Sequence, residues 1–374
     1  CLPHFGGNHG PGYPFFISII WYIFGENNYL IRLFQAIIYS FCCLYLLLSI
    51  DKLLKDRKSV TIIGFLLSFS PLLIAWPRFL QTETLSIAFS LFLLAEIILS
   101  LIYKKLRIFP IAFALILATW IRLDNIFMCI PIIFLSFYLH DFKNAVIRGS
   151  YIAIILFSTW GMWTLRNISV GLPKLIPTEM VMPNGGRPPT GYLKWTKTWL
   201  THEYERAGAL WGINRNNYNN ISIPTAAFKD PQEEIIIYNL LKELKVYDKK
   251  DFPKHIDDQF NKIAIHKIKE NPLDFWIVNP AIRAMRIWTN PFSSFGWPNQ
   301  MTDQGISNRD RLAGAKGDKS ILIEKAIEYP FNALSKGINA IYRIIVMLLF
   351  IYCLILLFKL KKNTDVFPLG IATL

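Results

Sequence analysis

Seven long apolar runs, separated by short polar segments, constrain the fold of this chain more than any other feature. The runs are 29–50, 60–76, 80–103, 108–121, 126–139, 146–165 and 338–358. A helix needs about 20 mainly apolar residues to cross a bilayer, and most of the runs reach or approach that length. Charged residues make up only 18% of the chain, whereas soluble domains carry about 25%. The sequence therefore predicts an all-α membrane protein, a polytopic helical bundle.

Lys and Arg outnumber Asp and Glu and give a net charge of +14, which by itself is compatible with a nucleic-acid partner. Their distribution argues against that partner. Many of them lie in four clusters between the apolar runs: Lys52, Lys55, Arg57 and Lys58; Lys104, Lys105 and Arg107; Lys143 and Arg148; Lys359, Lys361 and Lys362. Such clusters mark the cytoplasmic loops of multi-span proteins. We therefore predict a multi-pass protein of the plasma or inner membrane, in contact with membrane lipids and not with nucleic acid.

Runs 108–121 and 126–139 are short for spans, because 14 residues form a helix of only about 21 Å. Counted as two short spans, they put all four basic clusters on one side of the membrane. Counted as one span, they move the last two clusters to the other side, against the positive-inside rule. We therefore predict two short helices joined by a turn at 122–125, accommodated by local bilayer thinning or by burial of the turn in protein.

This topology divides the chain into four segments. Residues 1–28 form an outer loop with a juxtamembrane helix at 13–24. Residues 29–166 form a bundle of six spans, two of them short. Residues 167–337 form a mostly helical extracytoplasmic domain, with helices expected at 192–211, 232–244, 254–271 and 273–288 and a loop at 290–319. Residues 338–374 hold one more span and the start of a further, truncated one.

Ionisable side chains at membrane depth are energetically expensive, so they are the first candidates for a site. Five lie at the predicted outer ends of the spans: Arg78, Glu83, Arg122, Asp124 and Arg166. The arginines have an alternative interpretation as snorkelling or helix-end residues, and Asp124 as an ion-pair partner of Arg122 or a helix cap. Glu83 is too short to snorkel and is the strongest candidate. Glu96 stands alone in mid-span, and the sequence assigns it no role.

The polar segment contributes a second, weaker set of candidates. Arg283 and Arg286 are three residues apart on one helix face, which suits an anion such as phosphate or, equally, a face resting on lipid headgroups. Trp195, Trp199 and Trp211 have near-helical spacing, which favours a packed or interfacial face over a platform for a sugar. The histidines and the five cysteines show neither metal-ligand spacing nor a disulfide framework. We therefore predict no cofactor, and a divalent metal is not indicated.

Several short strings resemble bacterial glycosyltransferases related to the dolichyl-phosphate-mannose–protein mannosyltransferases. The strings are His9-Gly10-Pro11-Gly12-Tyr13-Pro14, Gln81-Thr82-Glu83-Thr84, Thr119-Trp120-Ile121-Arg122, Trp163-Thr164-Leu165-Arg166-Asn167 and Pro280-Ala281-Ile282-Arg283. They occur in the order expected for that family. The resemblance implies a GT-C-like membrane glycosyltransferase that takes a sugar from a polyprenyl-phosphate carrier. The acceptor would be a lipid, glycan or protein hydroxyl at the outer face, and His9 joins the candidate site residues.

In such an enzyme a carboxylate takes the proton of the acceptor hydroxyl, and cations bind the departing phosphate. Glu83 is the best carboxylate present, and Arg78, Arg122 and Arg166 are the phosphate candidates. The family's best-known catalytic aspartate precedes the Pro-Gly-Tyr-Pro helix, whereas this chain has no acidic residue before Glu26. We therefore expect the native protein to extend upstream by a span and an acidic outer loop, with Glu83 as a helper. Two alternatives stay open: a transporter or flippase, and a non-enzymatic subunit of cell-surface polysaccharide assembly.

Overall fold

The computed structural model describes residues 10–74, 76–169, 188–201, 203–214, 216–289 and 319–360. Across these residues the regular secondary structure is entirely helical. The chain divides into two compact units. Unit 1 comprises Cys1–Thr178, Phe295–Pro298 and Ile344–Leu374, and unit 2 comprises Glu179–Ser294 and Asn299–Arg343.

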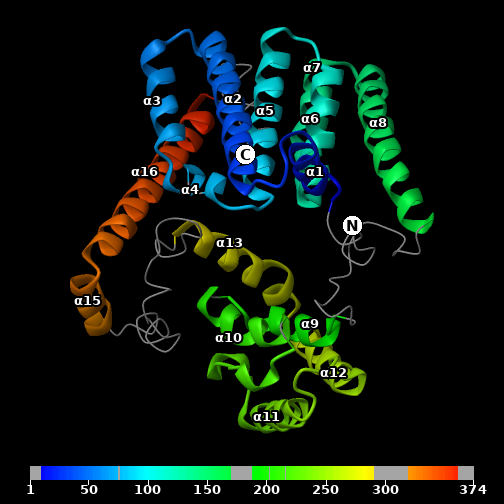
Figure 1. The fold of residues 1–374 in the computed structure, drawn as a ribbon, viewed down its shortest axis with the longest axis vertical. Helices are drawn as coiled ribbons and strands as arrows, with labels where there is room; N and C mark the ends of the chain where they lie inside the picture. The colour runs from blue at the N-terminus through cyan, green and yellow to red at the C-terminus, as the bar shows by residue number, and fades with distance from the viewer. Residues whose placement is uncertain are drawn as a thin grey trace. The chain divides into compact units, whose positions relative to one another are not determined.

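Unit 1 is a helical bundle in which α5 packs on both α2 and α6 (Figure 1). In chain order its elements are α1 (Gly12–Phe24), α2 (Asn28–Leu54), α3 (Arg57–Ser68), α4 (Pro71–Ile74), η1 (Trp76–Arg78), α5 (Glu83–Ile102), α6 (Ile108–Ile121), η2 (Leu123–Met128), α7 (Cys129–Leu139) and α8 (Phe142–Ser169). Helices α2, α5 and α8 are long and apolar enough to cross a membrane, and so is Ala333–Tyr352 within α16 (Pro330–Leu360). These helices confirm the predicted all-α polytopic membrane protein.

The helices of unit 1 are apolar both inside and outside the bundle. Leu93, Leu115 and Ile132 are buried in its core. Phe41 and Phe157, on α2 and α8, are 67% and 68% exposed. Helices that are apolar on every face belong in a membrane rather than in water, so the exposed aromatic residues of this unit are expected to contact lipid.

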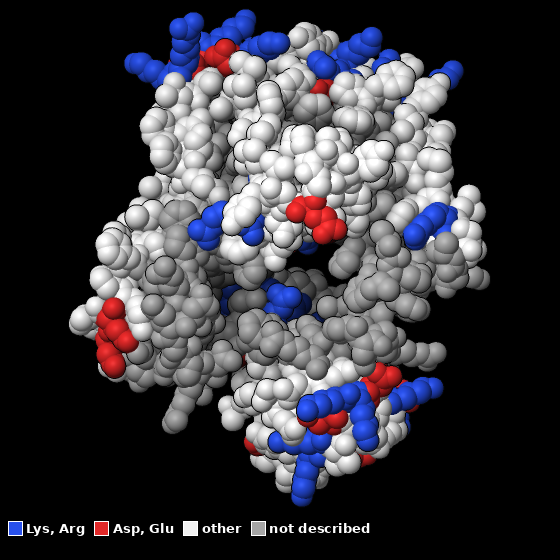
Figure 2. Space-filling view, viewed as in Figure 1, with Lys and Arg blue, Asp and Glu red and all other residues white. Residues whose placement is uncertain are grey.

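Three of the four basic clusters gather at one end of unit 1, which Figure 2 shows as a concentration of blue side chains. They occupy the connections α2–α3, α5–α6 and α7–α8 or directly flank them. In the first connection Lys55 ends α2 with a left-handed φ of 53°, and the Asp56 side chain caps α3 by accepting from the N–H groups of Lys58 and Ser59. The side chains of the fourth cluster lie outside the described residues. We call this the basic end of unit 1.

Breaks in the helices decide two of the predictions, one for run 60–76 and one for the pair of runs 108–121 and 126–139. Run 60–76, predicted as one span, is divided between α3 and α4, because Pro71 lacks an N–H and its ring clashes with a preceding helical turn. The second expected span is therefore discontinuous. Arg122 is extended, with φ −145° and ψ 123°, and separates α6 from η2 and α7. The two short helices and the turn between them are thus present as predicted.

Unit 2 is also built from helices. They are α9 (Thr190–Trp199), α10 (Glu203–Asn214), η3 (Tyr218–Asn220), η4 (Thr225–Ala227), α11 (Pro231–Lys245), α12 (Lys254–Glu270), the π-helical turn η5 (Asp274–Val278), α13 (Asn279–Thr289) and α15 (Lys319–Glu328). The expected loop at 290–319 lies almost entirely outside the described residues. Helices α11 and α12 match the expected segments closely, whereas the expected segment 273–288 is divided between η5 and α13.

The core of unit 2 is aromatic. Tyr192 and Trp195 are fully buried, Trp199 is 8% exposed, and their rings pack with one another and with Phe260 of α12. Gly191 permits this close approach, because a Cβ at this position would lie 2.1 Å from the backbone oxygen of Asp257. The tryptophans therefore form a packed face, as their spacing favoured, and the Trp211 side chain lies outside the described residues.

The segment 192–211, predicted as one helix, contains two. Leu200 has an extended ψ of 105° and ends α9, and α10 begins at Glu203. The backbone oxygens of Lys197 and Leu200 accept hydrogen bonds from Arg283 of α13. A tertiary contact therefore satisfies carbonyl groups that a continued helix would have used, which hydropathy spacing does not reveal.

Candidate functional site

Three of the predicted site residues form one ion-paired cluster in unit 1. Arg122 Nη1 lies 2.8 Å from Glu83 Oε1, and Arg122 Nη2 lies 3.0 Å from Asp124 Oδ2. Arg122 Nε also donates to both oxygens of Asp124, at 3.1 and 3.3 Å. Because one guanidinium faces two carboxylates, the cluster carries a net charge of about −1 when all three groups are ionised.

The positions of these residues follow from the helix ends. Glu83 is the first residue of α5, Arg122 follows the last residue of α6, and Asp124 lies in η2. Since α5 and α6 are packed neighbours joined at the basic end, their other ends meet at the opposite end of the bundle. The side chains of Glu83, Arg122 and Asp124 are 27%, 37% and 58% exposed, so the cluster is accessible. The hydrogen bond to Asp124 raises the pKa of Arg122 above its ordinary value.

A second set of polar contacts fixes the turn that carries Arg122. Asn125 Nδ2 donates to Ser86 Oγ at 2.9 Å and to the backbone oxygen of Ala118 at 2.8 Å. These bonds tie the turn both to α5 and to the last turn of α6. Arg122 and Asp124 are therefore held at a defined distance from Glu83.

Helix α1 packs against the same end of α6. A Cβ on Gly10 would lie 2.1 Å from the backbone oxygen of Trp120, and one on Gly12 would lie 3.0 Å from the Trp120 carbonyl carbon. Only glycine fits at such an approach. Next to it, buried Tyr13 donates to Gln35 Oε1 at 2.8 Å. Burial and the negative charge of Glu83 raise the pKa of Tyr13, which keeps this hydroxyl protonated beside the cluster.

The other predicted residues of this end do not join the cluster through a described contact. Arg78 is exposed and lies over the ring of Phe79, with 5.5 Å between its Cζ and the ring centroid. Arg166 is exposed, lies 4.9 Å from the centroid of Trp163 and donates to Asn167 Oδ1 at 3.1 Å. His9 lies outside the described residues. The structure thus brings Glu83, Arg122 and Asp124 together and places Arg78 and Arg166 on aromatic rings.

Arg283 and Arg286 in unit 2 have an arrangement that the sequence did not suggest. Arg283 Nη1 donates to the backbone oxygens of Lys197 and Leu200 at 3.3 and 3.1 Å, and Arg286 Nη1 donates to Thr201 Oγ1 at 2.7 Å. Guanidinium groups at a helix C-terminus satisfy its carbonyls and oppose its dipole. Burial lowers the pKa of Arg283. Neither an anion nor a lipid headgroup is needed to explain this pair.

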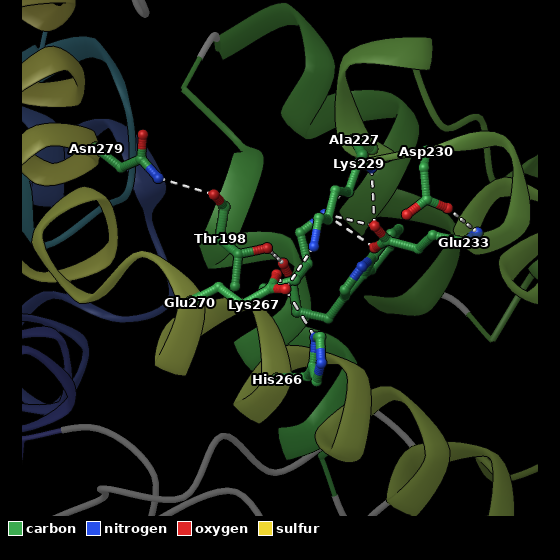
Figure 3. Close-up of polar contacts among 10 residues, drawn as sticks. Thr198, Ala227, Lys229, Asp230, Glu233, His266, Lys267, Glu270 and Asn279 are labelled. Carbon is green, nitrogen blue, oxygen red and sulfur yellow. Dashed lines mark hydrogen bonds and ion pairs between the residues drawn. The ribbon is translucent and has the colours of Figure 1, made fainter.

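Unit 2 also contains a compact network of charged residues (Figure 3). Lys267, only 16% exposed, donates to the backbone oxygen of Ala227 at 2.8 Å and to Glu233 at 2.9 Å. Lys229 pairs with Glu270 at 2.5 Å. These pairs join η4, α11 and α12, and each charge has an opposite charge beside it. The network therefore serves the fold of unit 2.

A buried charged group in unit 1 contains Glu96, to which the sequence assigned no role. Glu96, treated as alone in mid-span, is 1% exposed, lies 2.8 Å from Arg107 Nε and accepts a 2.5 Å hydrogen bond from the Tyr45 hydroxyl. The Arg107 contact is an ion pair without hydrogen-bond alignment. Arg107 had been counted only with the basic cluster of its loop. The signal that could have revealed this pair was the position of Arg107 directly after the tight turn that follows α5.

No group of three or more His, Cys, Asp or Glu residues suited to a metal ion occurs among the described residues. Cys42, Cys43 and Cys129 are free thiols within the helices of unit 1.

The fold and the cluster define a polytopic membrane protein with an accessible Glu–Arg–Asp group at its helix ends. Residues 8–163 match the model of the dolichyl-phosphate-mannose-protein mannosyltransferase family. No curated protein and no solved structure matches the chain. The matched region contains Glu83, Arg122, Asp124 and the segment packed on α6, whereas Arg166 lies beyond it. The match relates the chain to that family and supports a membrane glycosyltransferase of the GT-C type.

Proposed function

We propose that this protein transfers a sugar from a polyprenyl-phosphate carrier to a hydroxyl of a lipid, glycan or protein acceptor at the outer face of the plasma or inner membrane. The observation that carries the proposal is the accessible cluster of Glu83, Arg122 and Asp124. It lies within the residues related to the mannosyltransferase family and at the far end of α5 from the basic loops.

The chemistry requires one proton acceptor and one site for an anion. The acceptor oxygen attacks the anomeric carbon, and the bond from that carbon to the carrier phosphate breaks, so that the phosphate leaves with the electron pair. The hydroxyl proton passes to a carboxylate, a role that supplies about 10²- to 10⁴-fold in rate. We assign this role to Glu83, in place of the helper role expected from the sequence, because Arg122 fixes its Oε1 while the side chain stays partly exposed.

The geometry changes the role that we assign to Arg122. Its Nε, Nη1 and Nη2 all contact carboxylate oxygens, and a cluster of net negative charge repels a phosphate. We therefore assign Arg122 to positioning Glu83, with Asp124 completing the pair. The exposed Arg78 and Arg166, and His9, are the proposed ligands of the departing phosphate, since arginine binds two phosphate oxygens at once. Arg283 and Arg286 belong to the fold of unit 2.

The test is a transfer assay on the purified protein in liposomes, supplied with a radiolabelled polyprenyl-phosphate sugar and an acceptor extract. Labelled product is expected from the wild type and from the matched control Glu26→Gln, which alters an exposed carboxylate outside the cluster. Product is expected to be nearly absent with Glu83→Gln. Equal product from Glu83→Gln and the wild type would remove Glu83 from the chemistry. No product from a folded wild type with any polyprenyl-phosphate sugar would contradict the donor class.

The outer-face location has its own test. In a background without native cysteines, Asn219→Cys in η3 should react with an impermeant maleimide added outside intact cells. Lys58→Cys, in the first turn of α3 at the basic end of unit 1, should react only after the membrane is opened. Both positions are exposed. The reverse labelling pattern would contradict the proposed orientation.

A further inference from the structure

The helical stretch formed by η5 and α13 is inverted compared with an ordinary helix of a water-soluble domain. Its apolar residues Leu273, Trp276 and Ile277 are 67%, 70% and 60% exposed. Farther along, Ala281 and Ala284 are also exposed and Met285 is 65% exposed. A surface helix normally buries its apolar stripe and exposes its polar one.

The polar residues of α13 face the protein instead. Asn279, Arg283 and Arg286 are spaced i, i+4 and i+7, which places them on one face of the helix. All three reach the end of α9, where they bond to the backbone oxygens of Thr198, Lys197 and Leu200 and to the hydroxyl of Thr201. Figure 3 shows the first of these contacts, between Asn279 and Thr198. Four hydrogen bonds therefore fix the orientation of α13, and its exposed apolar residues lie away from α9.

Helix α12, the preceding helix of the same unit, shows the ordinary arrangement. Its apolar residues Ile256, Phe260 and Ala264 are fully buried, and Asp258 on its other side is exposed. The inversion is thus a property of the η5–α13 stretch and not of unit 2 as a whole.

The bilayer surface is the environment that matches this face. In the sequence, α9 to α13 lie between two helices long and apolar enough to span a membrane, Phe142–Ser169 and Ala333–Tyr352, so the chain tethers them to the bilayer. The exposed residues Trp276, Ile277 and Val278 are all apolar, and the one exposed charged side chain of the stretch, Asp274, lies at its start. A face of tryptophan and aliphatic residues with a charge at its edge suits the boundary of headgroups and acyl chains. In water, the exposed apolar surface of these side chains would cost about 25 cal/mol of free energy for each Å².

We propose that the stretch from Leu273 to Met285 lies in the membrane interface, with Trp276, Ile277 and Ala281 inserted about 5–10 Å into the headgroup and acyl boundary. The inward-facing Asn279, Arg283 and Arg286 hold α13 on the end of α9, so unit 2 rests on the lipid surface through a helix of fixed orientation. This inference is independent of the proposed transfer reaction.

The test uses spin labels on the full chain in liposomes of phosphatidylethanolamine and phosphatidylglycerol. Ile277→Cys and Ala281→Cys carry the label in a background without native cysteines, and Asp258→Cys on α12 is the matched control in the same unit. Collisions with O₂, which concentrates in the bilayer, and with a water-soluble nickel chelate are measured at each site by power saturation. At 277 and 281 the ratio of O₂ to nickel collisions should exceed that at 258.

Removal of the bilayer provides the second arm. In detergent-free buffer with an amphipathic polymer in place of lipid, the ratios at 277 and 281 should fall toward the control value. Nickel collisions at 277 and 281 equal to those at 258 in liposomes would show that the face lies in water and would overturn the proposal. Low collision rates with both reagents would show that protein covers the face and would overturn it equally. Two independent label sites keep the test decisive if one variant fails to fold.

Discussion

Glu83 and Glu96 lie on the same helix, and each forms an ion pair with an arginine at one end of α6. Arg107 directly precedes α6 and pairs with Glu96, whereas Arg122 directly follows α6 and pairs with Glu83. The α5–α6 hairpin is thus held at both ends by the same chemistry. The environments differ, because Glu96 is 1% exposed and Glu83 is 27% exposed.

This difference separates a structural pair from a candidate site. We call the Glu96–Arg107 pair the sealed end of the hairpin and the Glu83–Arg122 pair its open end. Glu96 has one oxygen on Arg107 and the other on the Tyr45 hydroxyl, and burial excludes a substrate. Glu83 shares its arginine with Asp124 in an accessible group. A carboxylate that is both oriented and accessible can take up a proton from a bound hydroxyl, whereas a sealed one can only hold helices together.

The largest expected effect is on catalysis at the open end. Glu83→Gln should lower transfer in the labelled-donor assay by at least about 100-fold, or about 2.7 kcal/mol, because the amide cannot accept the hydroxyl proton. The midpoint of unfolding in SDS should stay close to that of the wild type, since the glutamine still accepts a hydrogen bond from Arg122. A variant that loses stability and activity in parallel would show that Glu83 only supports the fold.

The next effect is on stability at the sealed end. Glu96→Gln should reduce the free energy of unfolding by about 2 kcal/mol, less than for a fully buried pair because Arg107 is partly exposed and keeps contact with water. Transfer by the remaining folded protein should be unchanged. SDS titration followed by helical circular dichroism measures the first quantity. A stable Glu96→Gln variant without transfer activity would reverse the roles of the two ends.

Arg122→Lys should have a smaller effect, a fall of about 10-fold in kcat/KM, or about 1.4 kcal/mol, because a lysine keeps the charge but loses the fork that binds Glu83 and Asp124 together. The matched control is Arg107→Lys, whose single ionic contact with Glu96 a lysine can reproduce. Equal kcat/KM for the two lysine variants would mean that orientation of Glu83 does not limit the reaction.

Sequence reasoning succeeded where a local signal was sufficient. Hydropathy and the count of basic loops predicted the turn at Arg122 and the common end of three basic clusters, because both depend on the order of residues along the chain. The break at Pro71 was predictable, because proline interrupts a helix. The length of run 60–76 nevertheless favoured a single span. The grouping of Glu83, Arg122 and Asp124 followed from the predicted topology, which placed all three at one end.

The errors at Glu96 and at Arg283 share one physical cause, which is pairing between residues distant in sequence. Glu96 and Tyr45 are 51 residues apart, and Arg283 and Leu200 are 83 apart. Composition and spacing do not specify which helices are neighbours or at what register. Arginine in particular fits a phosphate, a headgroup, a carboxylate or a helix C-terminus, so its role depends on the partner that the fold supplies.

The smallest predicted effect isolates one hydrogen bond of the sealed pair. Tyr45→Phe removes the hydroxyl that donates to Glu96 at 2.5 Å but keeps the ring, which stacks on Phe92 with 5.1 Å between centroids. The free energy of unfolding should fall by about 1 kcal/mol, since a hydrogen bond to a charged, buried acceptor is lost while packing is retained. Tyr29→Phe, at a position 77% exposed on the same helix, is the control and should leave stability unchanged.

Combining Tyr45→Phe with Glu96→Gln tests whether the two residues act as one unit. The tyrosine hydroxyl stabilises Glu96 chiefly because the carboxylate is charged, so most of its contribution should vanish once residue 96 is a neutral amide. The double variant should therefore be about as stable as Glu96→Gln alone, and the loss should be well below the sum of the single losses. Strict additivity would show that the Tyr45 hydroxyl contributes independently of the charge on Glu96. The sealed end would then be a set of separate contacts, and only the open end would depend on a coupled charge group.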